Sequence, residues 1–424
     1  MAQGYPGFWY AGWGTQSVFG TAVAPQIFPR MASASKGQET IKTEEGYDGL
    51  NRELSWIAKV AQMHELAFAS QFYPGPTTAA LMNMFGITDL VSGTLTTGSS
   101  TLGASAVIGA TSVTMTASTG YSNGQTLLFG TAGSAGSELV TLGTISGTTF
   151  PIIAPSTGLR YAHASGSSVL GVTDPYTHTG TSTNAIPNPF SFEHSIGQQP
   201  SPASPLDVVR TPDGIFTGIK LDATGGKVAT AAFDIAGRLG VPGGGAATVG
   251  FTTDAPLVLS APGTAFTVGA YSSTPGTGMD ILTANVVQFG MDTKLTPDPV
   301  QPAGTLAPYQ NATVRGTTLN CKVWIPSNAL MREIYYGSSS GTTPIIQVQQ
   351  TTFQVKFDEQ GTPDHYVQLL FNQFAAKAGM PTFSAEGKAM LFTLSGIAMP
   401  SGATGALTIT SQTADGLNYN SFGM

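Results

Sequence analysis

The chain has 424 residues, enough for two or three domains, but only 10% of them are charged, against roughly 25% in an ordinary soluble domain. Its net charge is −7 and its lysines and arginines form no cluster, which argues against a protein that binds nucleic acid through a basic surface. Cys321 is the only cysteine, which excludes an intrachain disulfide. The sequence also predicts no transmembrane helix and, because its first basic residue is Arg30, no signal peptide.

So neutral a surface predicts that copies of the chain cover much of it, since a freely soluble monomer usually keeps a charged exterior. The alternative interpretation of the composition is a secreted β-protein rich in serine and threonine. The aromatic content is normal, so we expect a true hydrophobic core in either case.

The first regular element that we expect is a short helix at 76–86, with a proline at its start and Gly86 at its end. The segment 214–235 predicts a β-hairpin that turns at Gly225 and Gly226. A second short helix is expected at 326–337, because this segment has the same arrangement of proline, helix formers and glycine.

Two further segments alternate apolar and polar residues, as half-buried strands do. In 286–295 the alternation places Val287, Phe289, Met291 and Leu295 on one face, and Gln288, Asp292 and Lys294 on the other. In 351–359 it separates Phe353, Val355 and Phe357 from Gln354, Lys356 and Asp358. The predicted fold class is therefore mainly β.

The segment 92–172 differs from its surroundings. From residue 90 to residue 173 the only charged residues are Glu138 and Arg160. Short runs rich in valine and threonine alternate there with glycine-containing turns at intervals of about 8–12 residues. This pattern predicts a small all-β domain.

The chain contains a distant repeat. The order strand, proline, short helix with Ala-Leu-Met occurs around Leu81 and again around Leu330, and a strand that begins with Gly-Lys occurs at 226–237 and again at 387–396. The two copies are farther apart at the helix than at the closing strand, by about the length of the segment 92–172. We therefore predict two tandem domains, the first at 1–91 and 173–248, the second at 249–424, with 92–172 inserted into the first.

No catalytic motif lies in the structural context that its chemistry needs. The stretch GSSSG at 337–341 fits the nucleophile-elbow pattern, but a predicted helix precedes it where a strand is required. His64 lacks the second histidine of a zinc-protease helix, and the five histidines show no metal-ligand spacing. The glycosylation sequence at 311–313 is expected to be unused. We predict no enzymatic activity, no metal and no cofactor.

Charged residues concentrate in one segment, 36–65. They are either a solvated loop or hairpin, or an arm whose ion pairs set the register with a neighbouring molecule. The second interpretation assigns a ring-stacking role to Lys36, Glu39, Lys42, Glu44, Glu45, Asp48, Arg52 and Glu53.

Several stretches in order resemble one known family. They are GWGTQSVFGTAVAPQIFPRMASAS near the start, ELAFASQFYPGPTTAALMNMFG, DPYTHTGTSTNAIPNPFSFEHSIG, DGIFTGIKLDATGGKVATAAFDIAG, and NVVQFGMDTKL through NCKVWIP. In this combination the chain resembles the tail tube (major tail) proteins of long-tailed, siphovirus-type phages, of a longer tandem-domain type with an inserted β domain. Gln16 stands where the family commonly has glutamate.

This resemblance implies β-sandwich or half-barrel domains, each with a flanking helix, whose strands join those of neighbours into one barrel around a lumen. It implies a structural virion protein, made in the host cytoplasm, that polymerises as stacked rings into the tail tube through which DNA is ejected. The implied partners are the chain itself, a tape measure protein inside the tube, and tail terminator and baseplate proteins at its ends, with no membrane and no specific DNA binding.

Two alternatives stay open on the sequence. If each tandem domain takes one of six places, three chains complete a pseudo-six-fold ring; if only one domain surrounds the lumen, six chains do. The competing function is a receptor-binding or adhesin-like surface protein built of β modules, in which the insert binds glycans. Clustered exposed aromatic residues or a secretion signal would favour that function.

Overall fold

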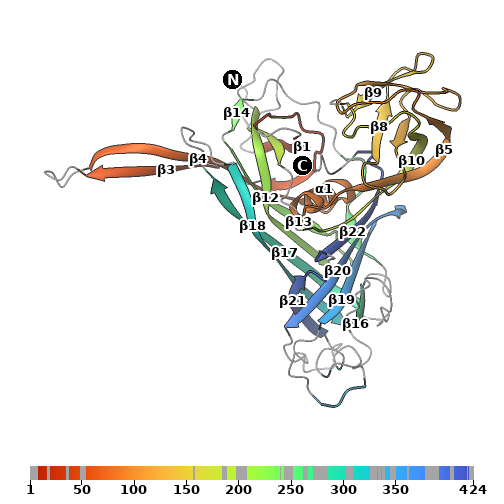
Figure 1. Ribbon diagram of the computed structural model, residues 1–424. Coiled ribbons are helices and arrows are strands. Elements are labelled where there is room, and N and C mark those ends of the chain that lie inside the picture. Colours follow the sequence, from red (N-terminus) through yellow and green to blue (C-terminus); the bar gives the residue numbers. More distant parts are fainter. Residues whose placement is uncertain are drawn as a thin grey trace, which may run out of the picture.

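The computed structural model shows a mainly β protein, as the alternating patterns predict (Figure 1). It describes residues 8–16, 20–34, 38–47, 54–155, 158–183, 189–196, 208–238, 240–242, 252–260, 266–270, 285–300, 309–324, 332, 336, 340–343, 350–360, 362–377, 391–401, 405–417 and 419. The paired strands in these ranges are all antiparallel.

The strands of the first part of the chain form two connected groups. In the larger group, β13 pairs with one side of β4, while β2 and β3 each pair with the other side, and β12 follows β13. In the smaller group, β1 pairs with β11, and β11 and β14 pair with the start of β12. The bounds are β1 Phe8–Thr15, β2 Met31–Ala34, β3 Gln38–Tyr47, β4 Leu54–Gln71, β11 Phe190–Ile196, β12 Val208–Thr224, β13 Thr230–Gly237 and β14 Val241–Pro242.

The strands after residue 250 form a second group. Here β18 lies between β17 and β21, and β20 pairs with β21, β22 and β19, whose other edge holds β15 and β16. The bounds are β15 Leu257–Leu259, β16 Phe266–Ala270, β17 Asn285–Val300, β18 Tyr309–Trp324, β19 Gln350–Glu359, β20 Thr362–Lys377, β21 Leu391–Met399 and β22 Leu407–Thr413.

The two groups repeat one strand order. The row β3–β4–β13–β12 has its counterpart in β17–β18–β21–β20, and in each group the last strand of the row also pairs with the strand that precedes it in the chain, β11 or β19. A helix follows β4; after β18, the described residues Arg332 and Tyr336 have helical conformation, while the rest of the helix expected at 326–337 lies outside the described residues.

Helix α1, Pro74–Met84, confirms the helix expected at 76–86 and is buried along its whole length. It begins with prolines, which suit the first turn because their missing N–H groups would have no partner there. It ends in a Schellman motif: Gly86 has φ +58°, its N–H donates to the Asn83 carbonyl, and the Ile87 N–H donates to the Met82 carbonyl.

One hydrophobic core contains residues of α1 and of both strand groups. Trp13, Phe68, Phe216 and Phe233 form an aromatic cluster on the first group, and Phe72 reaches across to Phe357 of the second, with ring centroids 5.0 Å apart. The predicted faces are confirmed where side chains are described: Phe289, Met291, Leu295, Phe353, Val355 and Phe357 are all buried. The predicted hairpin is β12–β13, with Gly226 at φ +75° in its turn.

Most of the segment 92–172 folds around a separate core (Figure 1). Its long strands β5 and β10 pair with each other and run from this core back into the body, where β10 pairs with β22. The bounds are β5 Leu90–Thr101, β6 Ser112–Thr114, β7 Thr126–Phe129, β8 Glu138–Leu142, β9 Thr149–Ala154 and β10 Ser168–Thr181. The expected limits of the insert therefore fall inside two continuous strands, and the division into domains stays a prediction.

The two charged residues of this segment are buried together. The Glu138 carboxylate accepts hydrogen bonds from the backbone N–H groups of Arg160 and Tyr161, at 2.7 and 3.1 Å, and lies 2.8 Å from His163 Nε2. The Arg160 guanidinium donates to Gln26 of the body at 3.4 Å. The charges of the insert thus fix its own loop and its contact with the body.

Candidate functional site

The two strand groups join edge to edge at one seam, formed by β12 and β17. Seven residues of each strand pair there, from Gly218 opposite Lys294 to Thr224 opposite Gln288. The strands β4–β13–β12–β17–β18–β21 therefore form one continuous row across both groups.

The core side of the seam is apolar. Leu221 lies opposite Met291 and Ala223 lies opposite Phe289, and all four side chains are buried. Burial of apolar side chains contributes about 1.5–3 kcal/mol for each large one, so this packing holds the two groups together more strongly than surface charges do.

The other side of the row is polar, and we call it the polar face. Each of its residues alternates along its strand with a core residue. Residues that pair across neighbouring strands lie on the same side of the sheet: Ala232 pairs with Lys220, Lys220 with Asp292, and Asp292 with Thr318. Its members on β4, β13, β12, β17 and β18 are Glu65, Ala67, Ala69, Gln71, Thr230, Ala232, Asp234, Lys220, Asp222, Thr224, Gln288, Gly290, Asp292, Lys294, Thr318, Asn320 and Lys322.

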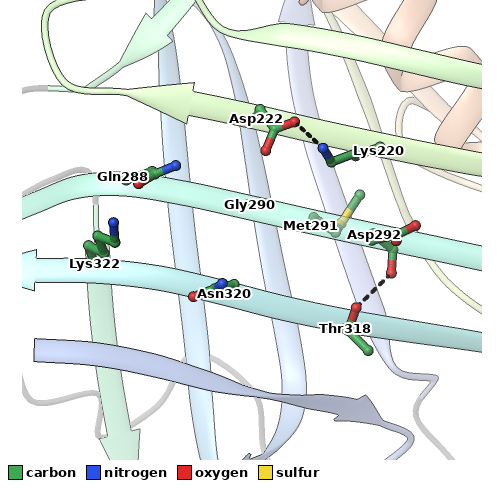
Figure 2. A pocket seen from close by; sticks show the side chains of 9 residues that line it. All are labelled: Lys220, Asp222, Gln288, Gly290, Met291, Asp292, Thr318, Asn320 and Lys322. Carbon is green, nitrogen blue, oxygen red and sulfur yellow. Dashed lines mark hydrogen bonds and ion pairs between the residues drawn. The ribbon is translucent and has the colours of Figure 1, made fainter. Parts of the chain in front are cut away.

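Figure 2 shows the centre of the polar face, an open groove of about 370 Å³ over the seam. Lys220 forms an ion pair with Asp222 at 2.9 Å, and Lys294 lies 4.0 Å from Asp292. The hydrogen bond and the charge of Asp222 raise the pKa of Lys220. Partial burial raises the pKa of Asp234, an effect that Lys294 opposes and Asp292 reinforces.

The polar face has many charged side chains but a net charge close to zero. Three lysines face four carboxylates, and most other side chains are short. The described residues that line the groove include no histidine, cysteine or serine. A row of lysines without acidic neighbours would hold nucleic-acid phosphates, whereas this mixture does not favour strong attraction.

A second candidate surface is the outer edge of β2 and β3. By strand order, β2 and β3 correspond to β17, whose outer edge carries the seam. Among the described residues, β2 and β3 pair only with β4. An edge with unpaired backbone N–H and C=O groups is a template for another strand.

The charged segment predicted from the sequence contains a long hairpin. β3 pairs with residues 54–65 of β4, whereas β13 pairs with β4 only from His64 onward. In the described part of the chain, the outer part of the hairpin, which includes residues 54–63, therefore has no third strand beside it. It extends away from the body (Figure 1). About ten residues per strand give it a reach of roughly 30 Å. Glu39, Lys42, Glu44 and Glu45 lie on β3, while Lys36, Asp48, Arg52 and Glu53 lie outside the described residues.

Sequence reasoning missed most of the polar face as a site. The alternation in 286–295 did place Gln288, Asp292 and Lys294 on one face, but nothing in either strand alone indicates that β12 pairs with β17. The five histidines are all buried. Asn311 of the glycosylation sequence lies on β18, and residues 337–339 of GSSSG lie outside the described residues.

Scanning the chain against protein-family models produced no match, and comparison with curated proteins produced none either. Within the described ranges, no helix combines the length and the apolar character that crossing a membrane demands.

Proposed function

We propose that the protein is a structural virion protein that polymerises as stacked rings into the tail tube of a long-tailed phage. The observation that carries this proposal is the seam. Two groups with the same strand order, β3–β4–β13–β12 and β17–β18–β21–β20, join by their edges into one row. A joint that connects two similar units can be repeated between chains, and such repetition closes a ring or extends a filament.

The ring follows from repeating the seam. The outer edge of β2 and β3 would take, toward a neighbouring chain, the part that β17 takes within the chain. Its partner there would be a strand other than β20, the counterpart of β12, because β19, β21 and β22 already pair along β20. Six such units of four strands would form a barrel of about 24 strands, with a backbone diameter of at least about 37 Å at a strand spacing of about 4.8 Å. If each chain supplies two units, three chains complete the ring. Closure would pair every edge, which removes the aggregation hazard of open edges.

The polar face supports a lumen on that side of the row. The opposite side carries the hydrophobic core and α1, so only the polar face is available to line a channel. Its near balance of lysine and carboxylate suits the passage of DNA without retention. In this arrangement the insert lies on the outside of the tube.

The remaining parts of the proposal rest on the resemblance. The tape measure protein would lie in the lumen, and terminator and baseplate proteins would meet the two ends of the tube. The chain would be made in the host cytoplasm and reside in the virion, with no catalytic activity.

Electron microscopy of the purified full-length chain tests this proposal. We expect rings and stacked tubes. Isolated particles at every protein concentration would contradict the proposal and favour the adhesin-like alternative.

Two neighbouring proline variants test the edge itself. Ser33 and Ala34 pair in register with Ala69 and Phe68, and successive N–H groups of a strand point to opposite sides. One of Ser33→Pro and Ala34→Pro therefore removes a hydrogen bond to β4, and the other removes an N–H at the outer edge, where proline is tolerated in a monomer. We expect the second type to keep its melting temperature but form no rings. Rings from both variants would show that this edge is not used.

A further inference from the structure

Three ligand-type side chains meet where the segment between the two strand groups contacts the β19–β20 hairpin. Asp254 lies in that segment, Glu359 ends β19, and His365 lies on β20. Their side chains are 0–7% exposed. Glu359 and His365 are six residues apart, but Asp254 lies far from both in the chain, so no spacing in the sequence indicates the cluster.

The donor atoms converge. His365 Nδ1 lies 2.5 Å from Glu359 Oε2 and 3.8 Å from Asp254 Oδ1, and the three ligand atoms all lie within 4.8 Å of one another. On the other side of the ring, His365 Nε2 lies 2.7 Å from Asp174 Oδ1 on β10. A carboxylate behind the second ring nitrogen is the arrangement that orients a histidine toward a metal ion.

The buried carboxylates of Asp254 and Glu359 accept hydrogen bonds from the backbone: the Ala414 N–H donates to Asp254 Oδ1 at 2.8 Å, and the Ala255 N–H donates to Glu359 Oε1. The Thr252 hydroxyl lies 3.3 Å from Asp254 Oδ2 and 3.2 Å from Asp415 Oδ2. Because a hydroxyl has one proton, it satisfies only one of these two carboxylates. Arg30 donates to the Thr252 carbonyl at 3.3 Å.

We propose that Asp254, Glu359 and His365 bind a zinc ion, with Asp174 positioning the imidazole. One imidazole nitrogen and two carboxylates suit Zn²⁺, whereas Ca²⁺ takes six to eight oxygens. The ion takes the Nδ1 lone pair, Nε2–H donates to Asp174, and the proton now shared by Nδ1 and Glu359 is released. The side chain of Asp174 is 47% exposed, so solvent reaches that side of the site.

Bound zinc would connect three parts of the molecule. Asp254 belongs to the segment between the strand groups, Glu359 and His365 belong to the second group, and Asp174 lies on the strand that leads out of the insert. The ion therefore stabilises the arrangement of the insert relative to the body. This inference does not depend on the proposed function.

The test uses the full-length chain after dialysis against a chelator. Calorimetric titration with zinc chloride should show one site per chain, and the melting temperature should rise with zinc concentration. Asp254→Asn and His365→Gln should each abolish the site. Asp174→Asn should weaken zinc affinity 10–100-fold without removing it. His163→Gln is the matched control, because His163 is also buried beside a carboxylate, at 2.8 Å from Glu138, in the separate core of the insert.

Cobalt chloride provides a second readout, because bound Co²⁺ should give visible absorption in the wild-type chain and in His163→Gln but not in Asp254→Asn. Should His365→Gln fail to fold, the isosteric Asp254→Asn variant decides the question alone. The proposal is overturned if zinc at millimolar concentration leaves the wild-type melting temperature unchanged. It is equally overturned if Asp254→Asn binds zinc as tightly as the wild type.

Discussion

At the scale of single residues, His194 is the group whose burial has the clearest consequence. It is fully buried on β11, with its ring centroid 5.1 Å from that of His64 and 6.3 Å from that of Phe192. Burial, with a smaller contribution from His64, lowers its pKa from 6.5 to about 3. The folded chain therefore keeps this imidazole neutral at pH values where the unfolded chain protonates it.

This difference predicts an acid-sensitive fold. Between pH 6.5 and pH 3 the unfolded state binds one proton more at this position, so the free energy of unfolding should fall by up to about 1.4 kcal/mol per pH unit as the pH decreases. Urea denaturation at several pH values should show that slope, and His194→Phe should reduce it. An unchanged slope in the variant would mean that other groups cause the acid sensitivity.

Residue positions were predictable from the sequence only where a local pattern reports them. The alternation in 286–295 predicted which side of β17 each residue occupies, since the period of a strand is fixed by its geometry. The partners of buried charges were not predictable, because they come from distant parts of the chain. Glu193, for example, accepts a hydrogen bond from Tyr10 at 2.6 Å and pairs with Arg210.

At the scale of elements, the β3–β4 hairpin is the part with the longest reach. We expect it to contact the next ring and fix the axial register. Exposed ion pairs contribute only about 0.2–1 kcal/mol each, so one substitution should have little effect. Reversal of Glu44, Glu45 and Asp48 to lysine together should leave rings but stop their stacking, as seen by electron microscopy.

A matched reversal on the polar face separates this role from a general effect of charge. Glu65→Lys, Asp222→Lys and Asp234→Lys together make the same change in net charge on residues that would line the lumen. That variant should form stacked tubes, although a basic lumen should retain DNA. Normal tubes from the hairpin variant, or loss of stacking in both variants, would refute the stacking role of the hairpin.

The insert should be dispensable for assembly. Thr94 and Thr173 are direct partners on β5 and β10, so an Asn-Gly turn between them can replace residues 95–172 and close a hairpin. This junction keeps Asp174 and the pairing of β10 with β22. The shortened chain should melt cooperatively and form tubes that lack outer lobes; an unfolded product would show that the insert is not autonomous.

Elements were predictable where their signals are local. The helix at α1 and the hairpin β12–β13 were, because proline, glycine and alternation mark their ends. The limits of the insert were not, because β5 and β10 continue through them and no turn residue marks the crossing. The repeated strand order agrees with the repeat seen in the sequence, but the limits of the two tandem domains stay a prediction.

At the scale of the whole molecule, the seam joins two units of similar strand order within one chain. It is the pattern for the joint that we propose between chains. The sequence indicated the repeat but not the seam, since edge pairing depends on strands that are distant in sequence. Covalent connection of two units also explains how only one of them carries an insert.

Native mass spectrometry of disassembled rings tests this account most directly. We expect a mass that corresponds to three chains per ring, each of 43.6 kDa. Electron microscopy of the same rings should show pseudo-six-fold cross-sections with three outer lobes. Rings of six identical chains with six lobes would contradict the tandem arrangement, and the absence of any ring would contradict the tube.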